Sequence, residues 1–256
     1  MSRFGFSFEK GGAHTARSMM LQEMQLLLSA VESPNALKKD YQIAVIEENC
    51  LGKRSGRNRA ITWRHLVDLY SLDSSTTIFR ILLFFWKRDS KGQPLLALLL
   101  AYSRDEILRM SAPFFLKLKE GVIVRRETLE DYLDEKSSGR FSKNTLKSTA
   151  QNLSATWTKS GHLAGKVKKV RSRAESTPGA ASYALLLGYL AGARGEFLFK
   201  TEYAKLLDCS MEHATELAED ASRRGWIVFK RLGNVMEVLF PNLLTTREME
   251  WVREQN

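Results

Sequence analysis

Apolar residues recur at spacings of three and four along most of this chain, which is the periodicity of helices with one buried face. The first such segments predict helices over about residues 15–31, 34–51 and 56–69. Ser33-Pro34 marks the start of the second helix, because proline is favoured in the first turn. We therefore expect the chain to begin with a helical bundle.

Two nearly continuous apolar runs follow, at Ile78–Trp86 and Pro94–Tyr102. Neither approaches the roughly 18–20 apolar residues that a membrane-spanning helix needs, so we expect no membrane association. Both runs are interpreted as buried helices of a helical core. Ser103, with Glu106 three residues later, matches a capping box and predicts the start of the next helix.

The pattern changes over residues 122–171. It predicts a short strand at 122–124, a helix at 127–135, a longer helix capped by Ser142, and an alternating ribbon at 162–171. Helix, turn, longer helix and ribbon is the order of elements in a winged helix. The longer helix has an apolar stripe formed by Leu146, Ala150, Leu153 and Trp157.

A similar order of elements returns near the C-terminus. Residues 172–181 are rich in Ser, Pro, Gly and Ala and are interpreted as a linker. The elements predicted after it are helices at 183–191, 201–207 and 210–224, then strands at 226–231 and 235–240 around Leu232-Gly233-Asn234.

The predicted fold class is therefore mainly α, with two domains. Residues 1–175 form a helical bundle with helix-turn-helix elements that ends in a basic winged helix. Residues 176–256 form a second winged helix with a small β-hairpin.

Charge is concentrated in one stretch. The chain has 39 Lys and Arg residues against 29 Asp and Glu residues, a net charge of +10. Residues 136–174 contain no acid, and their bases equal this whole excess. Nucleic-acid phosphate is the most natural partner for such a stretch. The bases are Lys136, Arg140, Lys143, Lys147, Lys159, Lys166, Lys168, Lys169, Arg171 and Arg173.

If the apolar stripe of the longer helix faces the core, its opposite face offers ammonium groups for phosphates and amides that can contact bases. In the ribbon, a period of two would place Lys166 and Lys168 on one side and Val167 on the other. The alternative is a solvated basic face without a ligand. The expected contacts here are Arg140, Lys143, Asn144, Lys147, Ser148, Gln151, Lys166, Lys168, Lys169 and Arg171.

A second basic cluster precedes the third helix. It comprises Lys53, Arg54, Arg57 and Arg59, with Arg64 beyond them. Free backbone N–H groups at a helix start suit an anion. The cluster lacks the spacing of a Walker loop, so nucleotide hydrolysis is not predicted. A solvated helix start remains the alternative.

The helix predicted at 210–224 differs, because its outer face is acidic. Such a face repels a phosphate backbone and favours a protein partner. A backbone could still be touched at its edge by Arg223, Arg224, Lys230 and Arg231. The acids are Glu212, Glu216, Glu219 and Asp220.

No catalytic or metal-binding pattern is present, so no enzyme activity and no cofactor are expected. The histidines His14, His65, His162 and His213 lack metal-pair spacing. Cys50 and Cys209 lack CxxC spacing and are interpreted as reduced thiols, which agrees with a cytoplasmic protein. The first residues contain no apolar run typical of a secretory signal.

Short motifs in this chain resemble the BrxA family of accessory proteins in BREX bacteriophage-resistance systems. The motifs are Phe8-Glu9-Lys10-Gly11-Gly12-Ala13, Glu48-Asn49-Cys50-Leu51-Gly52-Lys53 with Ser55, and Ser142-x-x-Thr145 followed by Trp157-x-x-Ser160-Gly161-His162-Leu163. The resemblance covers about residues 6–175, and the C-terminal part more loosely.

The resemblance implies a cytoplasmic bacterial protein with helix-turn-helix elements, related in fold to helical RNA-binding antitermination factors. It also implies DNA binding within a phage-defence system, and it supplies no catalytic residues. Some members carry an inner-membrane label, which the short apolar runs here oppose.

Together these patterns favour a non-enzymatic accessory protein that binds double-stranded DNA largely through backbone electrostatics and works with other phage-defence subunits. A protein-interaction adaptor and an RNA-binding protein remain the alternatives, because lysine binds both nucleic-acid backbones.

Overall fold

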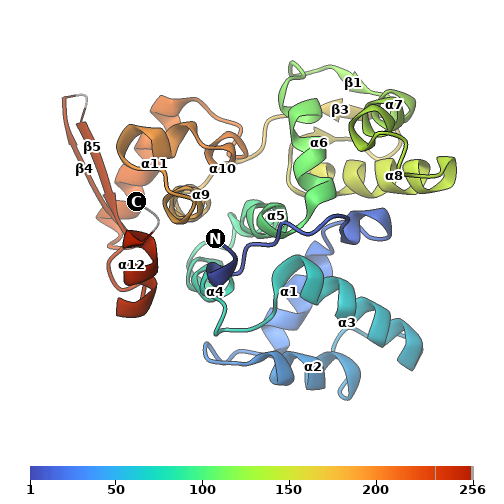
Figure 1. Ribbon diagram of the computed structural model, residues 1–256, viewed down its shortest axis with the longest axis horizontal. Coiled ribbons are helices and arrows are strands. Elements are labelled where there is room, and N and C mark those ends of the chain that lie inside the picture. The colour runs from blue at the N-terminus through green and yellow to red at the C-terminus, as the bar shows by residue number, and fades with distance from the viewer. Residues whose placement is uncertain (234, 255–256) are drawn as a thin grey trace.

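The computed structural model describes residues 1–233 and 235–254 and is mainly helical, with two small antiparallel sheets (Figure 1). The α-helices are α1 (Leu21–Ala30), α2 (Lys38–Ile46), α3 (Gly56–Tyr70), α4 (Thr77–Arg88), α5 (Gln93–Arg104), α6 (Glu106–Leu116), α7 (Arg126–Ser137), α8 (Lys143–Lys159), α9 (Pro178–Leu190), α10 (Glu202–Lys205), α11 (Met211–Arg223) and α12 (Thr246–Arg253). Short 3₁₀ turns are η1 (Ser2–Phe4), η2 (Ala13–Thr15) and η3 (Gly195–Lys200). The strands are β1 (Ile123–Val124), β2 (Leu163–Ala164), β3 (Lys169–Arg171), β4 (Val228–Leu232) and β5 (Val235–Leu239).

The centre of the molecule is formed by α4, α5 and α9, which lie between the other elements in Figure 1. The apolar run of α5 is buried on every side, which confirms that the two apolar stretches form core helices. Helix α9 is buried equally and is fixed to α4 by a hydrogen bond from Tyr183 Oη to the Ile78 carbonyl (2.8 Å).

The predicted linker is wrong beyond residue 177. Thr177 caps α9 and Pro178 begins it, so a Thr-Pro-Gly-Ala stretch that resembles a flexible segment is a helix start. Gly179 lies against α4, where its N–H donates to Asp89 (2.8 Å) and a Cβ would collide with that carboxylate. The C-terminal elements therefore dock directly on the N-terminal bundle.

The first two helices begin later than predicted. Helix α1 starts at Leu21, because η2 and the left-handed backbone at Met20 occupy the preceding residues. Helix α2 starts at Lys38 instead of Pro34, with Asp40 accepting a hydrogen bond from the Leu37 N–H (2.7 Å). The third predicted helix agrees with α3.

Helices α6, α7 and α8 surround a three-stranded sheet in the order β1-β3-β2, in which both neighbouring pairs are antiparallel. Ser142 caps α8 by accepting from the Thr145 N–H (3.2 Å), and the predicted apolar stripe is buried. Trp157 in this stripe stacks on Phe115 and donates its Nε1–H to Ser111 Oγ (3.0 Å).

The predicted ribbon is shorter than its alternating sequence suggests. Only Leu163–Ala164 and Lys169–Arg171 are strand, and the residues between them form the connecting loop. Gly165 begins this loop with φ +94°, where any Cβ would collide with the Lys168 carbonyl. The expected two-sided arrangement of Lys166, Val167 and Lys168 is therefore wrong.

The C-terminal elements follow the predicted order closely. Ser210 caps α11, and β4 pairs with β5 in a hairpin whose register places Lys230 opposite Glu237. Position Asn234 of the predicted turn lies outside the described residues. Helix α12 packs near the base of the hairpin, and its Glu248 forms an ion pair with Arg80 of α4 (2.6 Å).

A buried polar contact joins the N-terminal segment to the α5–α6 corner. His14 Nδ1 lies 3.0 Å from the Asp105 carboxylate, and both side chains are almost fully buried. Asp105 also caps α6 by accepting from the Leu108 N–H (2.9 Å). The predicted capping box at Ser103 is thus wrong, because Ser103 lies in the last turn of α5 and its hydroxyl donates to the Leu99 carbonyl.

A second buried contact joins the three-stranded sheet to the C-terminal elements. His162 touches Ser160 Oγ (2.9 Å) and donates its Nε2–H to the Leu206 carbonyl (3.2 Å). Beside it, Arg171 binds Asp208 with both guanidinium nitrogens (2.5 and 2.7 Å). Burial lowers the pKa of His162 to about 4, although the Asp208 charge opposes the shift.

Replacing Asp105 by Ala is expected to lower the unfolding free energy by about 3 kcal/mol, because His14 loses its buried partner and α6 loses its cap. Asp105→Asn keeps a capping oxygen and should cost clearly less. Urea unfolding at pH 7.5 measures both. Equal losses in the two variants would contradict this role.

The His162 side chain predicts a pH dependence of stability. Its pKa is near 4 when folded and near 6.5 when unfolded, so between these values the unfolded chain binds the extra proton. Stability present above pH 6.5 is lost as pH falls, by about 2 kcal/mol between pH 7.5 and 5. His162→Gln should remove most of this slope in denaturant titrations, whereas an unchanged slope would assign it to other groups.

Candidate nucleic-acid interface

The open face of α8 is defined by what covers its flanks. The η2 segment lies along one side, where Ser148 Oγ donates to the Thr15 carbonyl (3.2 Å) and Asn152 Nδ2 donates to that of His14 (3.1 Å). The apolar stripe fills the other side. The residues left exposed on α8 by both contacts are Lys143, Asn144, Lys147, Gln151 and Lys159.

The loop between β2 and β3 extends the basic surface. Lys166, Val167 and Lys168 are exposed, with Val167 almost wholly in solvent. Lys169 is half-buried, and its ammonium donates to the Gly165 carbonyl (2.7 Å), which closes the loop. Two of the three loop lysines therefore have ammonium groups free to meet phosphates.

Three of the residues predicted to contact nucleic acid have their polar groups engaged within the protein. Arg140 forms an ion pair with Glu106 (3.1 Å) and covers the Phe141 ring (4.7 Å to its centroid). The Ser148 hydroxyl is engaged with backbone carbonyls. Arg171 is only 6% exposed and points inward to Asp208, so we remove it from the interface.

The second basic cluster is divided between solvent and structure. Arg54 and Arg57 are exposed, whereas Lys53 pairs with Glu23 of α1 (3.1 Å) and Arg59 is half-buried. Ser55 caps α3 by accepting from the Asn58 N–H (3.2 Å). One of the N–H groups expected to face an anion is therefore already engaged.

Glu23 of α1 lies within electrostatic range of one cation from each basic cluster. Burial opposes ionisation of this carboxyl, but the hydrogen bond from Lys53 and the charge of Lys159 hold its pKa below the usual value. Lys159 also reaches Ser18 Oγ (3.0 Å).

Sequence reasoning missed Arg17, which has no basic neighbours in the chain. It is exposed in the segment after η2, between α3 and α8. Burial and the charges of Arg64 and Arg17 lower the pKa of His65, so both guanidinium groups lie near that ring. No local pattern signals this position, because it arises only from tertiary packing.

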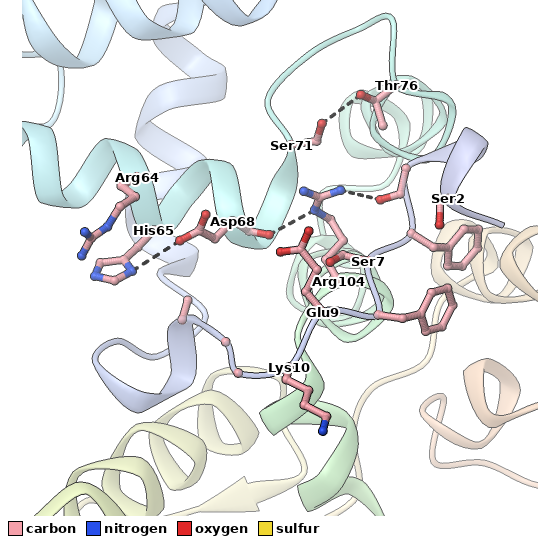
Figure 2. Close-up of a pocket in the computed structure, with 16 residues that line it drawn as sticks. Ser2, Ser7, Glu9, Lys10, Arg64, His65, Asp68, Ser71, Thr76 and Arg104 are labelled. Atoms are coloured by element: carbon pink, nitrogen blue, oxygen red, sulfur yellow. Dashed lines mark hydrogen bonds and ion pairs between the residues drawn. The ribbon is translucent and has the colours of Figure 1, made fainter.

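A polar cleft of about 670 Å³ lies beside this surface, between α3 and the N-terminal segment (Figure 2). Arg64, His65 and Asp68 project from α3 on one side, and Glu9 and Lys10 lie on the other. The His65 ring is 3.8 Å from the Asp68 carboxylate. Groups of both charges line the cleft, which gives it no simple preference for an anion.

Helix α11 presents the opposite charge. Glu212, Glu216 and Glu219 are exposed, while Asp220 pairs with Arg224 (2.8 Å) and with Arg223 (3.5 Å). In Figure 1, α11 lies toward the hairpin end of the long axis and α8 toward the other end, so the two helices are far apart. The acids therefore do not neutralise the basic surface.

Two further properties bear on function. Over residues 1–233 and 235–254, no three His, Cys, Asp or Glu side chains are placed to hold a metal ion. Within the same ranges, no helix combines the length and apolar character needed to cross a bilayer. No family model matches this chain, and no curated protein is significantly similar to it.

The burial of Arg171 predicts that its loss acts on folding. Arg171→Ala leaves Asp208 without its partner and should cost about 3 kcal/mol in urea unfolding. The salt dependence of DNA binding by the folded variant should stay unchanged. Lys168→Ala, the matched control on the neighbouring loop, should leave stability within about 0.5 kcal/mol. A lower salt dependence of binding in folded Arg171→Ala would contradict this structural role of Arg171.

Proposed function

We propose that this chain is a non-enzymatic DNA-binding protein that holds duplex DNA with a winged helix formed by α6 to β3. Helix, strand, two helices and two strands, with a sheet in the order β1-β3-β2, is the arrangement of that motif. In it the last helix enters the major groove and the loop between the last strands lies against the backbone. Helix α8 and the β2–β3 loop occupy these positions.

The observation that carries the proposal is the chemistry of the open α8 face. Lys143 and Lys147 lie in its first turns, the part of a recognition helix that approaches bases. Asn144 and Gln151 add amides, which pair with adenine edges in the major groove. The helix contains no carboxylate, so nothing on it repels phosphate.

The wing and the adjoining cations suit the flanking backbone. Lys166 and Lys168 are exposed at the loop tip, and Arg17, Arg54 and Arg57 are exposed on the N-terminal part of the chain. A surface of this kind binds mainly by releasing counterions from DNA, with little dependence on sequence.

The resemblance to the BrxA family is what suggests a cytoplasmic accessory role in phage defence. Several residues that carry it have structural duties here. The Gly11 N–H donates to Glu106, and Trp157, Ser160 and His162 are buried. Because these residues are buried, their presence supports a shared fold and says little about shared DNA contacts. The defence role therefore rests on the motifs alone.

The acidic face of α11 favours a second candidate function, as an adaptor that docks other defence subunits. Exposed Glu212, Glu216 and Glu219 would repel a backbone that approached this helix. The C-terminal elements would then hold a basic protein partner while the α8 surface holds DNA. The two functions are compatible, because the surfaces lie apart.

The α8 assignment is tested with Lys143→Ala/Lys147→Ala. Because two phosphate contacts are lost, the slope of log K against log salt should fall in magnitude by about 1.8. Fluorescence anisotropy with a labelled duplex over a salt series measures this slope. The matched control, Lys200→Ala/Lys205→Ala, removes two exposed lysines beyond α9 and should leave it unchanged.

Charge reversal in the β2–β3 loop, the wing of the proposed winged helix, tests the interface independently. Lys166→Glu/Lys168→Glu should weaken binding to all duplex sequences alike, because in the proposed interface these two side chains face phosphates. Affinities unchanged by both sets of substitutions would reject the winged-helix interface and bring the adaptor function to first place.

A further inference from the structure

The β4–β5 hairpin has an outer face that nothing in the described chain covers. It stands at the end of the molecule opposite α8, with α12 near its base (Figure 1). Strand alternation divides its side chains into two sets. Phe229, Met236 and Val238 turn inward, and Phe229 packs edge-on against Phe199.

The outer set consists of three cross-strand pairs. Val228 lies opposite Leu239 at the base, Lys230 opposite Glu237 in the middle, and Leu232 opposite Val235 near the tip. Leu232 and Val235 are 85% and 72% exposed, which is unusual for adjacent large apolar side chains. At the base, Val228 and Leu239 border an apolar cavity of about 260 Å³ beside Met249.

We propose that this outer face is a self-association surface, on which the hairpin of a second copy of this chain docks with two-fold symmetry. The argument is the charge pattern. Lys230 and Glu237 lie 3.6 Å apart within one copy and are both exposed, and a symmetric partner offers the same two charges in reverse, so the ion pair in the middle of the apolar face is self-complementary between copies.

The pattern also selects the orientation of the two copies. Two hairpins stacked face to face can be related by an axis along the strands or across them. An axis along the strands sets Lys230 over the partner's Glu237 and keeps the two apolar rows in contact. An axis across the strands at this row sets Lys230 over the partner's Lys230, and the repulsion excludes it.

The inner packing leaves room for such a pair. Helix α11 and η3 support the hairpin from its inward side, so in the proposed dimer they lie away from the partner. Six side chains make a face much smaller than the roughly 20–30 residues per side of a standard interface. The association should therefore be weak, reversible and dependent on concentration and salt.

The inference goes beyond DNA binding and does not rest on it. In such a dimer the two α8 surfaces would lie at the far ends, because in each copy α8 lies at the end opposite the hairpin. If an unrelated polypeptide occupied this face, the charges at Lys230 and Glu237 would not need to complement each other between two copies of the chain.

Charge exchange between copies tests the proposal without DNA. Sedimentation velocity of the full chain at low salt should show a monomer–dimer equilibrium. Lys230→Glu and Glu237→Lys should each weaken it by roughly tenfold, because each turns two attractive contacts into two repulsive ones. An equimolar mixture of the two variants should dimerise again, since every opposed pair is then of opposite charge.

The matched control uses Glu202→Lys and Lys205→Glu on α10, an exposed ion pair away from the hairpin. Neither variant, nor their mixture, should differ from the parent chain. Leu232→Ser should weaken the dimer through the apolar row, and circular dichroism checks that every variant is folded. A parent chain that stays monomeric up to its solubility limit, or a variant mixture no tighter than its components, would overturn the proposal.

Discussion

The contact between His14 and Asp105 decides which part of α8 can meet a ligand. Asp105 caps α6, holds His14, and accepts from the His14 N–H (3.3 Å), so one carboxylate fixes a helix start and a loop together. His14 Nε2 in turn lies 3.0 Å from Thr156 of α8. Burial opposes ionisation of Asp105, yet His14 and backbone N–H groups hold the pKa of this carboxyl below the usual range. The η2 segment is thereby pressed on one flank of α8, and only the lysine and amide face stays open.

The second constraint is the separation of charge by an apolar centre. Helices α5 and α9 carry nearly continuous apolar sequences because they are enclosed on all sides, and α8 and α11 lie on either side of this centre along the long axis in Figure 1. If α11 lay beside α8, its acids would pair with the lysines and weaken any hold on phosphate. The fold therefore keeps the basic and the acidic surface apart, as the two proposed functions require.

Much of this arrangement follows from local sequence. The Ser142 cap, the stripe ending at Trp157 and the existence of the C-terminal hairpin depend on residues close in the chain, so their patterns predict them. What failed depends on distant contacts. In the sequence Arg171 does not differ from its lysine neighbours, and only its ion pair with Asp208 buries it. The sequence around Pro178 is typical of a linker, and only packing against the end of α4 at Gly179 makes it a helix start. The joint effect of Arg17 and Arg64 on His65, and of Lys53 and Lys159 on Glu23, likewise exists only after folding.

The central claim is that the α8 surface recognises a duplex backbone. The most direct test is fluorescence anisotropy of the unmodified chain with a DNA duplex, a DNA single strand and a structured RNA of equal length, over one salt series. The account predicts that the duplex binds most tightly, with a steep linear fall of log K against log salt. Weak binding to all three at low salt would contradict it and would make the basic surface a protein-docking site, whereas preference for the RNA would change the class of nucleic acid.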